Sequence, residues 1–275
     1  MNYKQEIKAI AFDFDGTLID FNYNATDYTR KALDLLKDSQ YKVCLSSGRP
    51  CFLAKKAFTN TFGEYPLDYI FGCNGSEFED CKNNKTTLLY SLKQNEIVEL
   101  ANLLKNDYLT ICVYNGEEFL VDKPIDDPEL IEWLNARWLK PVVFDFNKND
   151  VERSKVLILN KKADRERENE FVESIKDKLS GFNYAYSSPN CLEIAPKGVS
   201  KAKSVEKLAE LLECINKQIL SFGDMANDMP MLLNSTGVIM DNASDDLKAQ
   251  ISLHTSRVDE LGVYDFLHTN GLIWG

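Results

Sequence analysis

Two aspartates, Asp13 and Asp15, follow a short apolar run in the segment AIAFDFDGTL. Residues two apart on an extended chain project from the same face, so these two carboxylates would lie together. At a separation of ~4 Å they would repel by about 4 kcal/mol at an effective dielectric constant of about 20. A cation or a shared proton must therefore accompany them, unless the aspartates only cap the segment that follows in an ordinary strand-end turn. Gly16 allows a sharp turn whose backbone N–H groups can bind an anion.

Other apolar runs along the chain also end in polar residues. Predicted strands lie at residues 7–12, 43–45, 69–71, 219–222 and 237–240. Helical spacing of apolar residues at 26–37 and after Ser200 places helices between them, which is typical of parallel crossovers. We therefore expect an α/β fold with a doubly wound, Rossmann-like parallel sheet. In such sheets ligands bind at the carboxyl ends of the strands, where Ser47, Gly48 and Asp224 would join the first two aspartates.

The middle of the chain has a different texture. A polar, turn-rich segment, EDCKNNKTT, begins at Glu79, and alternation with longer helices resumes at about Leu192. Between them we expect helices and strands, including strands at 109–114, 155–159 and 182–186, a hairpin turn at Asn115-Gly116 and a helix beginning at Asp127-Pro128. The charged run 161–170 would start another helix with a solvated face. The prediction is a core domain in two segments, 1–79 and 191–275, with an inserted α+β cap domain at 80–190.

Composition excludes several classes of protein. A formal net charge of −11 disfavours a nucleic-acid partner, because binding to phosphate backbones depends on Lys and Arg. The seven cysteines are an odd number without a CxxC pair, which indicates reduced thiols in a cytoplasmic protein. No apolar run approaches the ~18 residues of a membrane span, and no obligate protein partner is inferred. With only two histidines, His254 and His268, a His-based triad or metal site is not expected.

Four motifs in a fixed order resemble those of the haloacid dehalogenase-like superfamily, and most closely its Cof-like phosphatases with a type IIB cap. They are DFDGTL from Asp13, LSSGR ending at Arg49, the lysine-containing segment IAPKGVSKAKSVEKL, and GDMANDMPML from Gly223. The third motif's lysine is assigned to Lys201, although Lys197 and Lys203 are neighbours that sequence alone does not separate from it. The resemblance covers nearly the whole chain.

This resemblance implies a Mg²⁺-dependent phosphatase that acts on a small phosphorylated metabolite through an aspartyl-phosphate. Asp13 would be the nucleophile and Asp15 the general acid and base. The ion would be held by the Asp13 side chain, the Asp15 backbone carbonyl and Asp224, while Asp228 either reaches the ion or supports Lys201 and the metal ligands. The groups expected on the phosphate are the Phe14 N–H, Ser47, Gly48, Lys201 and Asn227.

Several alternatives remain open from the sequence. The substrate could be a sugar phosphate or a phosphorylated cofactor, the enzyme could be a hexose-phosphate phosphomutase, and the scaffold could belong to a ligand-binding regulatory protein. A cysteine-phosphatase loop between Cys44 and Arg49 is one residue too short, so Cys44 is interpreted as a buried strand residue. In the cap, Trp133, Arg137 and Trp138 are candidate substrate contacts, with Trp138 expected instead to pack on a helix face.

Overall fold

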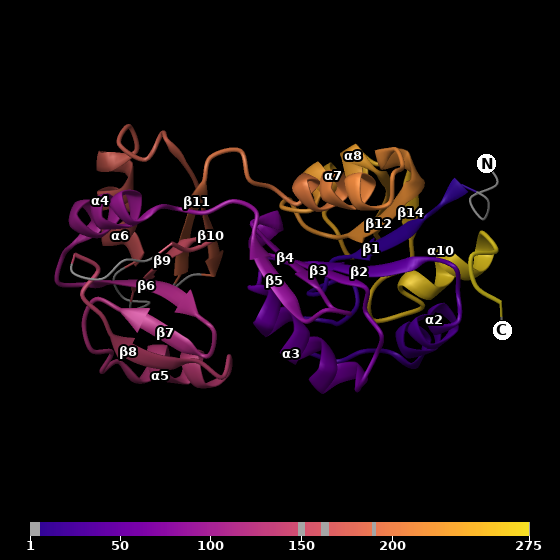
Figure 1. Cartoon of the computed structure of the whole chain (residues 1–275), viewed down its shortest axis with the longest axis horizontal. Helices are drawn as coiled ribbons and strands as arrows, with labels where there is room; N and C mark the ends of the chain where they lie inside the picture. Colours follow the sequence, from indigo (N-terminus) through magenta and orange to yellow (C-terminus); the bar gives the residue numbers. More distant parts are fainter. Residues whose placement is uncertain (1–5, 148–151, 161–164, 189–190, 275) are drawn as a thin grey trace. The chain divides into compact units, whose positions relative to one another are not determined.

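The computed structural model describes residues 6–147, 152–160, 165–188 and 191–274 (Figure 1). It divides into two compact units, Met1–Leu89 with Ser200–Gly275, and Tyr90–Val199. The chain thus enters and leaves the second unit as an insertion into the first. No helix among the described residues is long and apolar enough to cross a lipid bilayer.

The first unit is built on an eight-stranded sheet that is parallel from β14 to β3 and antiparallel at β4 and β5. In spatial order its strands are β14 (Leu253–Thr255), β13 (Thr236–Met240), β12 (Ile219–Gly223), β1 (Ala9–Phe12), β2 (Lys42–Ser46), β3 (Tyr69–Gly72), β4 (Glu77–Asp80) and β5 (Lys85–Leu88). The predicted strands are all present, and β14 and the β4–β5 hairpin are additions to them.

Helices cover both faces of this sheet (Figure 1). One face packs on α2 (Asp27–Lys37), α3 (Cys51–Phe62) and α10 (Val263–Thr269), and the other on α7 (Ala202–Leu211) and α8 (Met229–Asn234); α9 (Asp245–Lys248) follows β13. Strand β1 explains how both layers fit, because Ile10 and Phe12 face the first layer while the small Ala9 and Ala11 face the second. The predicted doubly wound α/β fold is confirmed.

The inserted unit has its own six-stranded sheet. In spatial order its strands are β10 (Phe182–Ser188), β11 (Cys191–Pro196), β9 (Val156–Asn160), β6 (Leu109–Asn115), β7 (Glu118–Val121) and β8 (Lys140–Val143). Its helices are α4 (Gln94–Leu104), α5 (Pro128–Asn135) and α6 (Arg165–Ile175). Apolar side chains of α4 and α6 pack in one cluster with the sheet, which makes this unit the α+β insert that the sequence predicts.

The boundaries of the insert lie later in the chain than residues 80 and 190. The polar segment after Glu79 is not a linker, because it forms the turn and second strand of the β4–β5 hairpin, which extends the first unit's sheet. At the other end, β11 pairs with β9 and β10 inside the second unit's sheet. Both ends of the predicted insert therefore move by one strand.

Local sequence patterns predict most helices and strands of the insert, but not the position of Trp138. Asp127 caps α5, since its side chain accepts a hydrogen bond from the Leu130 N–H with Pro128 at the first position. The helix ends at Asn135, and Trp138 lies beyond it with a φ of 55° and 40% of its surface exposed. The expectation that Trp138 packs on a helix face is therefore wrong. The beginning of the charged run 161–170 lies outside the described residues, and α6 begins at Arg165.

Candidate active site

The predicted site residues come from the carboxyl ends of adjacent parallel strands. Strands β13, β12, β1, β2 and β3 are neighbours in that order. Asp13 follows β1, Ser47 follows β2 and Asp224 follows β12. Parallel register places these strand ends at one edge of the sheet, so residues more than 200 positions apart in the sequence come together there.

Three carboxylates and one ammonium form the centre of the site. Asp13, Asp224 and Asp228 each offer an oxygen, and these oxygens lie within 4.8 Å of one another in a buried cluster. Lys201, which is 1% exposed, donates from Nζ to Asp13 Oδ1 and, at 2.5 Å, to Asp228 Oδ1. We call these four residues the carboxylate cluster. It holds more negative than positive charge.

The structure distinguishes Lys201 from its two lysine neighbours. Lys197 donates to the Ser180 carbonyl and Lys203 to Glu206 on its own helix, whereas Lys201 reaches the Asp13 carboxylate. Lys201 stands at the N-terminal end of α7, and this helix packs on the sheet face formed partly by Ala9 and Ala11. The small side chains of β1 are consistent with a close approach of α7 to the strand that carries Asp13.

Asp228 organises the turn after β12. Its Oδ2 accepts hydrogen bonds from the backbone N–H of Asp224 at 3.0 Å and of Met225 at 2.9 Å, while its Oδ1 accepts from Lys201. Gly223 permits this turn, since a Cβ at that position would lie 2.5 Å from the Asp228 Cβ. Both oxygens of Asp228 are thus engaged in holding the cluster together.

Asp224 approaches the turn after β1 very closely. A Cβ on Gly16, whose φ is +89°, would lie 2.2 Å from Asp224 Oδ2, so only glycine fits there. The same oxygen accepts a hydrogen bond from Asn242 Nδ2 at 3.1 Å, and Asn242 also donates to the Gly16 carbonyl at 2.9 Å. The second oxygen, Asp224 Oδ1, is buried without a hydrogen-bond partner. An oxygen of this kind is a candidate metal ligand.

The surroundings shift the pKa values of the cluster. Burial raises the pKa of Asp13 well above its usual value, and the charge of Asp228 adds to the rise. Burial, and then Asp228, raise the pKa of Asp224 to about 7. Burial alone would lower the pKa of Lys201, but its contacts with Asp13 and Asp228 raise it above the ordinary lysine value. Lys201 therefore stays charged, and its single positive charge is shared by more than one carboxylate.

Asp15 has a partner that sequence reasoning missed. Arg49 donates from Nε to Asp15 Oδ2 at 2.9 Å and from an Nη to Oδ1 at 2.6 Å, a two-pronged ion pair. Burial opposes the Arg49 charge, yet the hydrogen bond to Asp15 leaves the Arg49 pKa raised. Arg49 belongs to the second motif and follows β2, the strand next to β1. This position at the same edge of the sheet could have indicated that Arg49 lies near Asp15.

The remaining predicted phosphate-binding groups lie around the cluster. Phe14 connects Asp13 to Asp15; Ser47 is buried, and its Oγ accepts a hydrogen bond from the Arg49 N–H at 3.1 Å. Asn227 donates to Asn74 Oδ1 at 3.4 Å, and that oxygen would be 3.5 Å from a Cβ on Gly48. Asn74 thus joins Gly48 and Asn227 at this edge.

Asn74 is not among the phosphate-binding residues that the sequence predicts. It stands in the segment Cys73–Gly75 directly after β3, where Cys73, Asn74 and Gly75 have φ values of 49°, 56° and 93°. Its backbone N–H donates to the Ser47 carbonyl at 3.0 Å. The turn therefore places a side-chain amide beside Gly48, the glycine predicted to bind phosphate.

Three other residues singled out in the sequence lie among side-chain contacts of their own units. Cys44 is fully buried in β2, and burial raises the pKa of its thiol well above the usual value, as expected for a strand residue rather than a nucleophile. In the inserted unit, the Arg137 guanidinium carbon lies 4.1 Å from the centre of the Trp133 ring, and Trp133 contacts Phe119. Trp133 and Arg137 thus pack against each other on the inserted unit.

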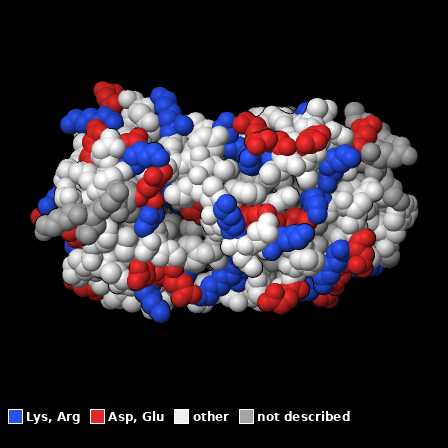
Figure 2. Space-filling view, in the orientation of Figure 1, with Lys and Arg blue, Asp and Glu red and all other residues white. Residues whose placement is uncertain are grey.

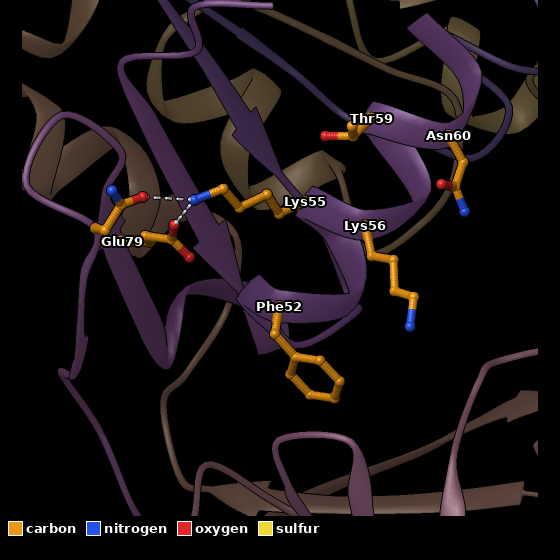
Figure 3. A pocket seen from close by; sticks show the side chains of 7 residues that line it. Phe52, Lys55, Lys56, Thr59, Asn60 and Glu79 are labelled. Carbon is orange, nitrogen blue, oxygen red and sulfur yellow. Dashed lines mark hydrogen bonds and ion pairs between the residues drawn. The ribbon is translucent and has the colours of Figure 1, made fainter. Parts of the chain in front are cut away.

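The rest of the first unit offers a shallow hollow on α3. It is lined by residues that include Phe52, Lys55 and Lys56 of the helix and Glu79 of β4. Figure 3 shows Lys55 turned toward Glu79, its partner at 2.6 Å, while Phe52 and Lys56 point away from it. None of the predicted site residues lines this hollow. On the face shown in Figure 2, acidic and basic side chains are interspersed.

Known proteins resemble the whole chain. The sequence profile described as haloacid dehalogenase-like hydrolase matches residues 10–267. An HMP-PP phosphatase of Yersinia pseudotuberculosis is 27% identical over 270 residues, covering 94% of this chain and 93% of the relative. A haloacid dehalogenase-like hydrolase structure from Bacteroides thetaiotaomicron superposes with a TM-score of 0.83 at 24% identity, covering 96% of this chain and 99% of that one. A solved subclass IIB sugar phosphatase of the same superfamily superposes with a TM-score of 0.74 at 22% identity, covering 97% and 100%.

Proposed function

Because this chain belongs to the haloacid dehalogenase-like hydrolase family, we propose that it is a magnesium-dependent phosphatase that hydrolyses small phosphomonoesters through an aspartyl-phosphate. Family membership, which the four motifs predict, is confirmed, and the chain is an enzyme of the phosphatase class. The observation that carries the mechanism is the buried contact between Lys201 and Asp13, beside Asp224 and Asp228.

The carboxylate cluster suits a divalent cation of the magnesium type. Hard cations favour carboxylate and carbonyl oxygens, and here Asp224 Oδ1 is buried without a partner beside an excess of negative charge. We assign the ion to the Asp13 and Asp224 side chains and the Asp15 backbone carbonyl. Bound there, it would offset carboxylate repulsion and stabilise charge on the phosphoryl group. Asp228 supports the site through Lys201 and the turn after β12, because both of its oxygens already accept hydrogen bonds there.

In the first step, a carboxylate oxygen of Asp13 forms a bond to phosphorus as the bond from phosphorus to the alcohol oxygen breaks. Asp15, in its protonated form, gives its proton to the departing oxygen. Lys201 orients Asp13 and faces the charge that develops on the phosphoryl oxygens. Ser47, Gly48, Asn227 and the Phe14 N–H are the further donors that we assign to those oxygens.

In the second step, Asp15 takes a proton from a water molecule that attacks the phosphorus of the aspartyl-phosphate. The bond between phosphorus and Asp13 breaks, which releases inorganic phosphate and restores the carboxylate. One residue can serve both steps because it is left unprotonated by the first. Arg49 holds Asp15 at the edge of the site through two hydrogen bonds, and this contact must loosen for either transfer.

The substrate that we propose is a sugar phosphate or a phosphorylated cofactor. A relative named HMP-PP phosphatase and a structural neighbour named sugar phosphatase both act on small phosphorylated compounds. The seven cysteines are all free thiols, which supports work in a reducing compartment such as the cytoplasm.

The test is phosphate release from a panel of sugar phosphates, nucleotides and phosphorylated cofactors, with Mg²⁺ or with EDTA, for the wild type and Asp13→Asn. We expect metal-dependent release that falls by at least about 1,000-fold in the variant. Asp34→Asn, on the exposed face of α2, is the matched control and should retain activity. Equal release by the Asp13 variant would contradict the mechanism, and isomerisation of a sugar phosphate without release would identify a mutase.

A further inference from the structure

The turn between β1 and α2 holds an aromatic residue in an unusual backbone conformation. Tyr23 has a φ of 65°, a left-handed conformation that is uncommon and strained for a bulky side chain. Asp20 fixes the turn, because its Oδ1 accepts hydrogen bonds from the backbone N–H of Asn22 at 2.9 Å and of Asn24 at 2.8 Å. The Tyr23 N–H donates to the Asp20 carbonyl at 3.0 Å.

The strain is not compensated by burial of the ring. Tyr23 is 58% exposed, so its side chain adds little to the core. The turn instead places the ring beside the candidate active site. The guanidinium carbon of Arg49 lies 5.6 Å from the centre of the Tyr23 ring and 5.5 Å from that of Phe14. Since Arg49 is also paired with both oxygens of Asp15, Tyr23 is tied to the group that we assign as proton donor.

The position of Tyr23 places its ring on the side of the site where the leaving group would lie. Under the mechanism above, Asp15 meets the alcohol oxygen of the substrate, so the rest of the alcohol must lie near Asp15 and its neighbours. Tyr23 presents a large, rigid and exposed ring on that side of the first unit. An exposed aromatic surface binds another flat ring by stacking, with centroids about 4.5–7 Å apart, and gains much less from a puckered ring that cannot lie parallel to it.

We propose that Tyr23 is a specificity residue that stacks on the leaving group, and that the preferred substrates are phosphomonoesters whose alcohol carries a planar aromatic or heteroaromatic ring. This inference rests on the proposed phosphatase function and narrows its substrate class from the phosphorylated cofactors and sugar phosphates to the former. Such a contact is made in both the ground state and the transition state, so it lowers KM and leaves kcat nearly unchanged.

Two phosphate esters of matched size separate stacking from other roles. Benzyl phosphate and cyclohexylmethyl phosphate differ in having a flat or a puckered ring, and both release a primary alcohol. For the Mg²⁺-loaded full chain, we expect Tyr23→Leu to raise KM about fivefold for benzyl phosphate and to leave KM for the cyclohexyl ester within about twofold. Tyr23→Phe, which keeps the ring, should retain the wild-type preference. Phe21→Leu, another exposed aromatic of the same turn, is the matched control and should change neither KM.

Each other outcome overturns the proposal in a recognisable way. If Tyr23→Leu raises KM or lowers kcat equally for both esters, the ring only positions Arg49 and Asp15. If no variant changes KM for benzyl phosphate, Tyr23 does not contact the leaving group. If the wild type releases phosphate from sugar phosphates but not from benzyl phosphate, the substrate class is wrong while the phosphatase function stands. If it releases phosphate from no ester at all, the proposed function fails as well. Thermal unfolding of each variant confirms that it is folded.

Discussion

Buried charge is arranged differently in the two units. In the inserted unit, Lys155 is 3% exposed and donates to the Glu193 carboxylate at 2.7 Å. In the first unit, Lys201 faces the three carboxylates of the carboxylate cluster. A matched pair on neighbouring parts of a sheet can be explained by the fold alone. An excess of buried negative charge cannot, because it costs stability unless a cation joins it.

The difference shows where to look for function. Lys155 directly precedes β9, and Glu193 lies on the adjacent strand β11, so this ion pair joins neighbouring parts of one sheet. The carboxylate cluster leaves Asp224 Oδ1 without a partner and holds two acids whose pKa values are raised. These features mark the carboxylate cluster as the candidate functional site.

Replacing the single ammonium of the cluster should have the largest effect. Lys201→Met leaves buried carboxylates without a counter-charge, so we expect the free energy of opening of β1 and β12 to fall by about 4 kcal/mol in metal-free protein. Amide hydrogen exchange of these strands measures it, with β6 and β9 of the inserted unit as the internal reference. Lys207 forms an ion pair with Glu210 at the surface of the same helix. Lys207→Met should lower the free energy of opening by less than about 1 kcal/mol. Equal losses for the two variants would mean that the cluster is not an energetic unit.

The pH dependence of stability should reveal the excess negative charge next. The folded-state pKa of Asp224 is raised to about 7, whereas the unfolded chain loses this proton near pH ~4. The folded state therefore binds more protons between these values, and its stability falls as pH rises through that window. In EDTA we expect the first unit to be less stable at pH 8 than at pH 5 by about 2 kcal/mol.

Asp224→Asn is the control for this pH effect, because it cannot ionise. Its denaturation curves should change less between pH 5 and pH 8, although the raised pKa of Asp13 still contributes. Mg²⁺ should reverse the trend in the wild type, since it binds the deprotonated form. If the wild-type protein becomes more stable from pH 5 to pH 8 in EDTA, the pKa values of Asp13 and Asp224 are not raised.

Sequence patterns predicted the residues of the cluster better than they predicted their contacts. Asp13, Asp224 and Asp228 stand in recognisable motifs at strand ends, and that information is local. Arg49 was available in the same motif, but its pairing with Asp15 depends on the spacing between β1 and β2 and on the turn after each strand. Contacts of this kind are set by tertiary structure, so neither residue type nor sequence spacing predicts them.

The limits of the insert show the same distinction. Polar, turn-rich composition was taken as a domain boundary after Glu79, yet the segment belongs to a hairpin whose first strand, β4, pairs with β3 and whose second strand, β5, pairs with β4. Composition reports solvent exposure, and an exposed edge hairpin and a linker are equally exposed. Asn242 was not predicted as a site residue, because its hydrogen bonds to Gly16 and Asp224 depend on tertiary structure.

Breaking the matched pair should have a smaller, local effect. Glu193→Gln leaves Lys155 charged and buried, with a weaker acceptor in place of the carboxylate. Because Glu193 is partly exposed, screening reduces the cost, and we expect β9 and β11 to lose about 2 kcal/mol of opening free energy. Glu173→Gln, in the exposed pair with Lys176, is the matched control. The exchange of β1 and β12 and the stabilisation by Mg²⁺ should stay unchanged, and a change in either would show that the two clusters are coupled.

Removing both charges of the pair should have the smallest effect of all. In Lys155→Met with Glu193→Leu, neither a buried ammonium nor a carboxylate remains, and the methionine can still lie against Tyr114, whose ring is 5.5 Å from Lys155 Nζ. We expect the opening free energy of β9 and β11 to stay within about 1 kcal/mol of the wild-type value, and to be higher than in Glu193→Gln. The corresponding change in the first unit, Lys201→Met with Asp13→Asn, still leaves Asp224 and Asp228 together and should remain unstable without metal. If hydrogen exchange showed equal recovery in both double variants, excess negative charge would not be what distinguishes the active site.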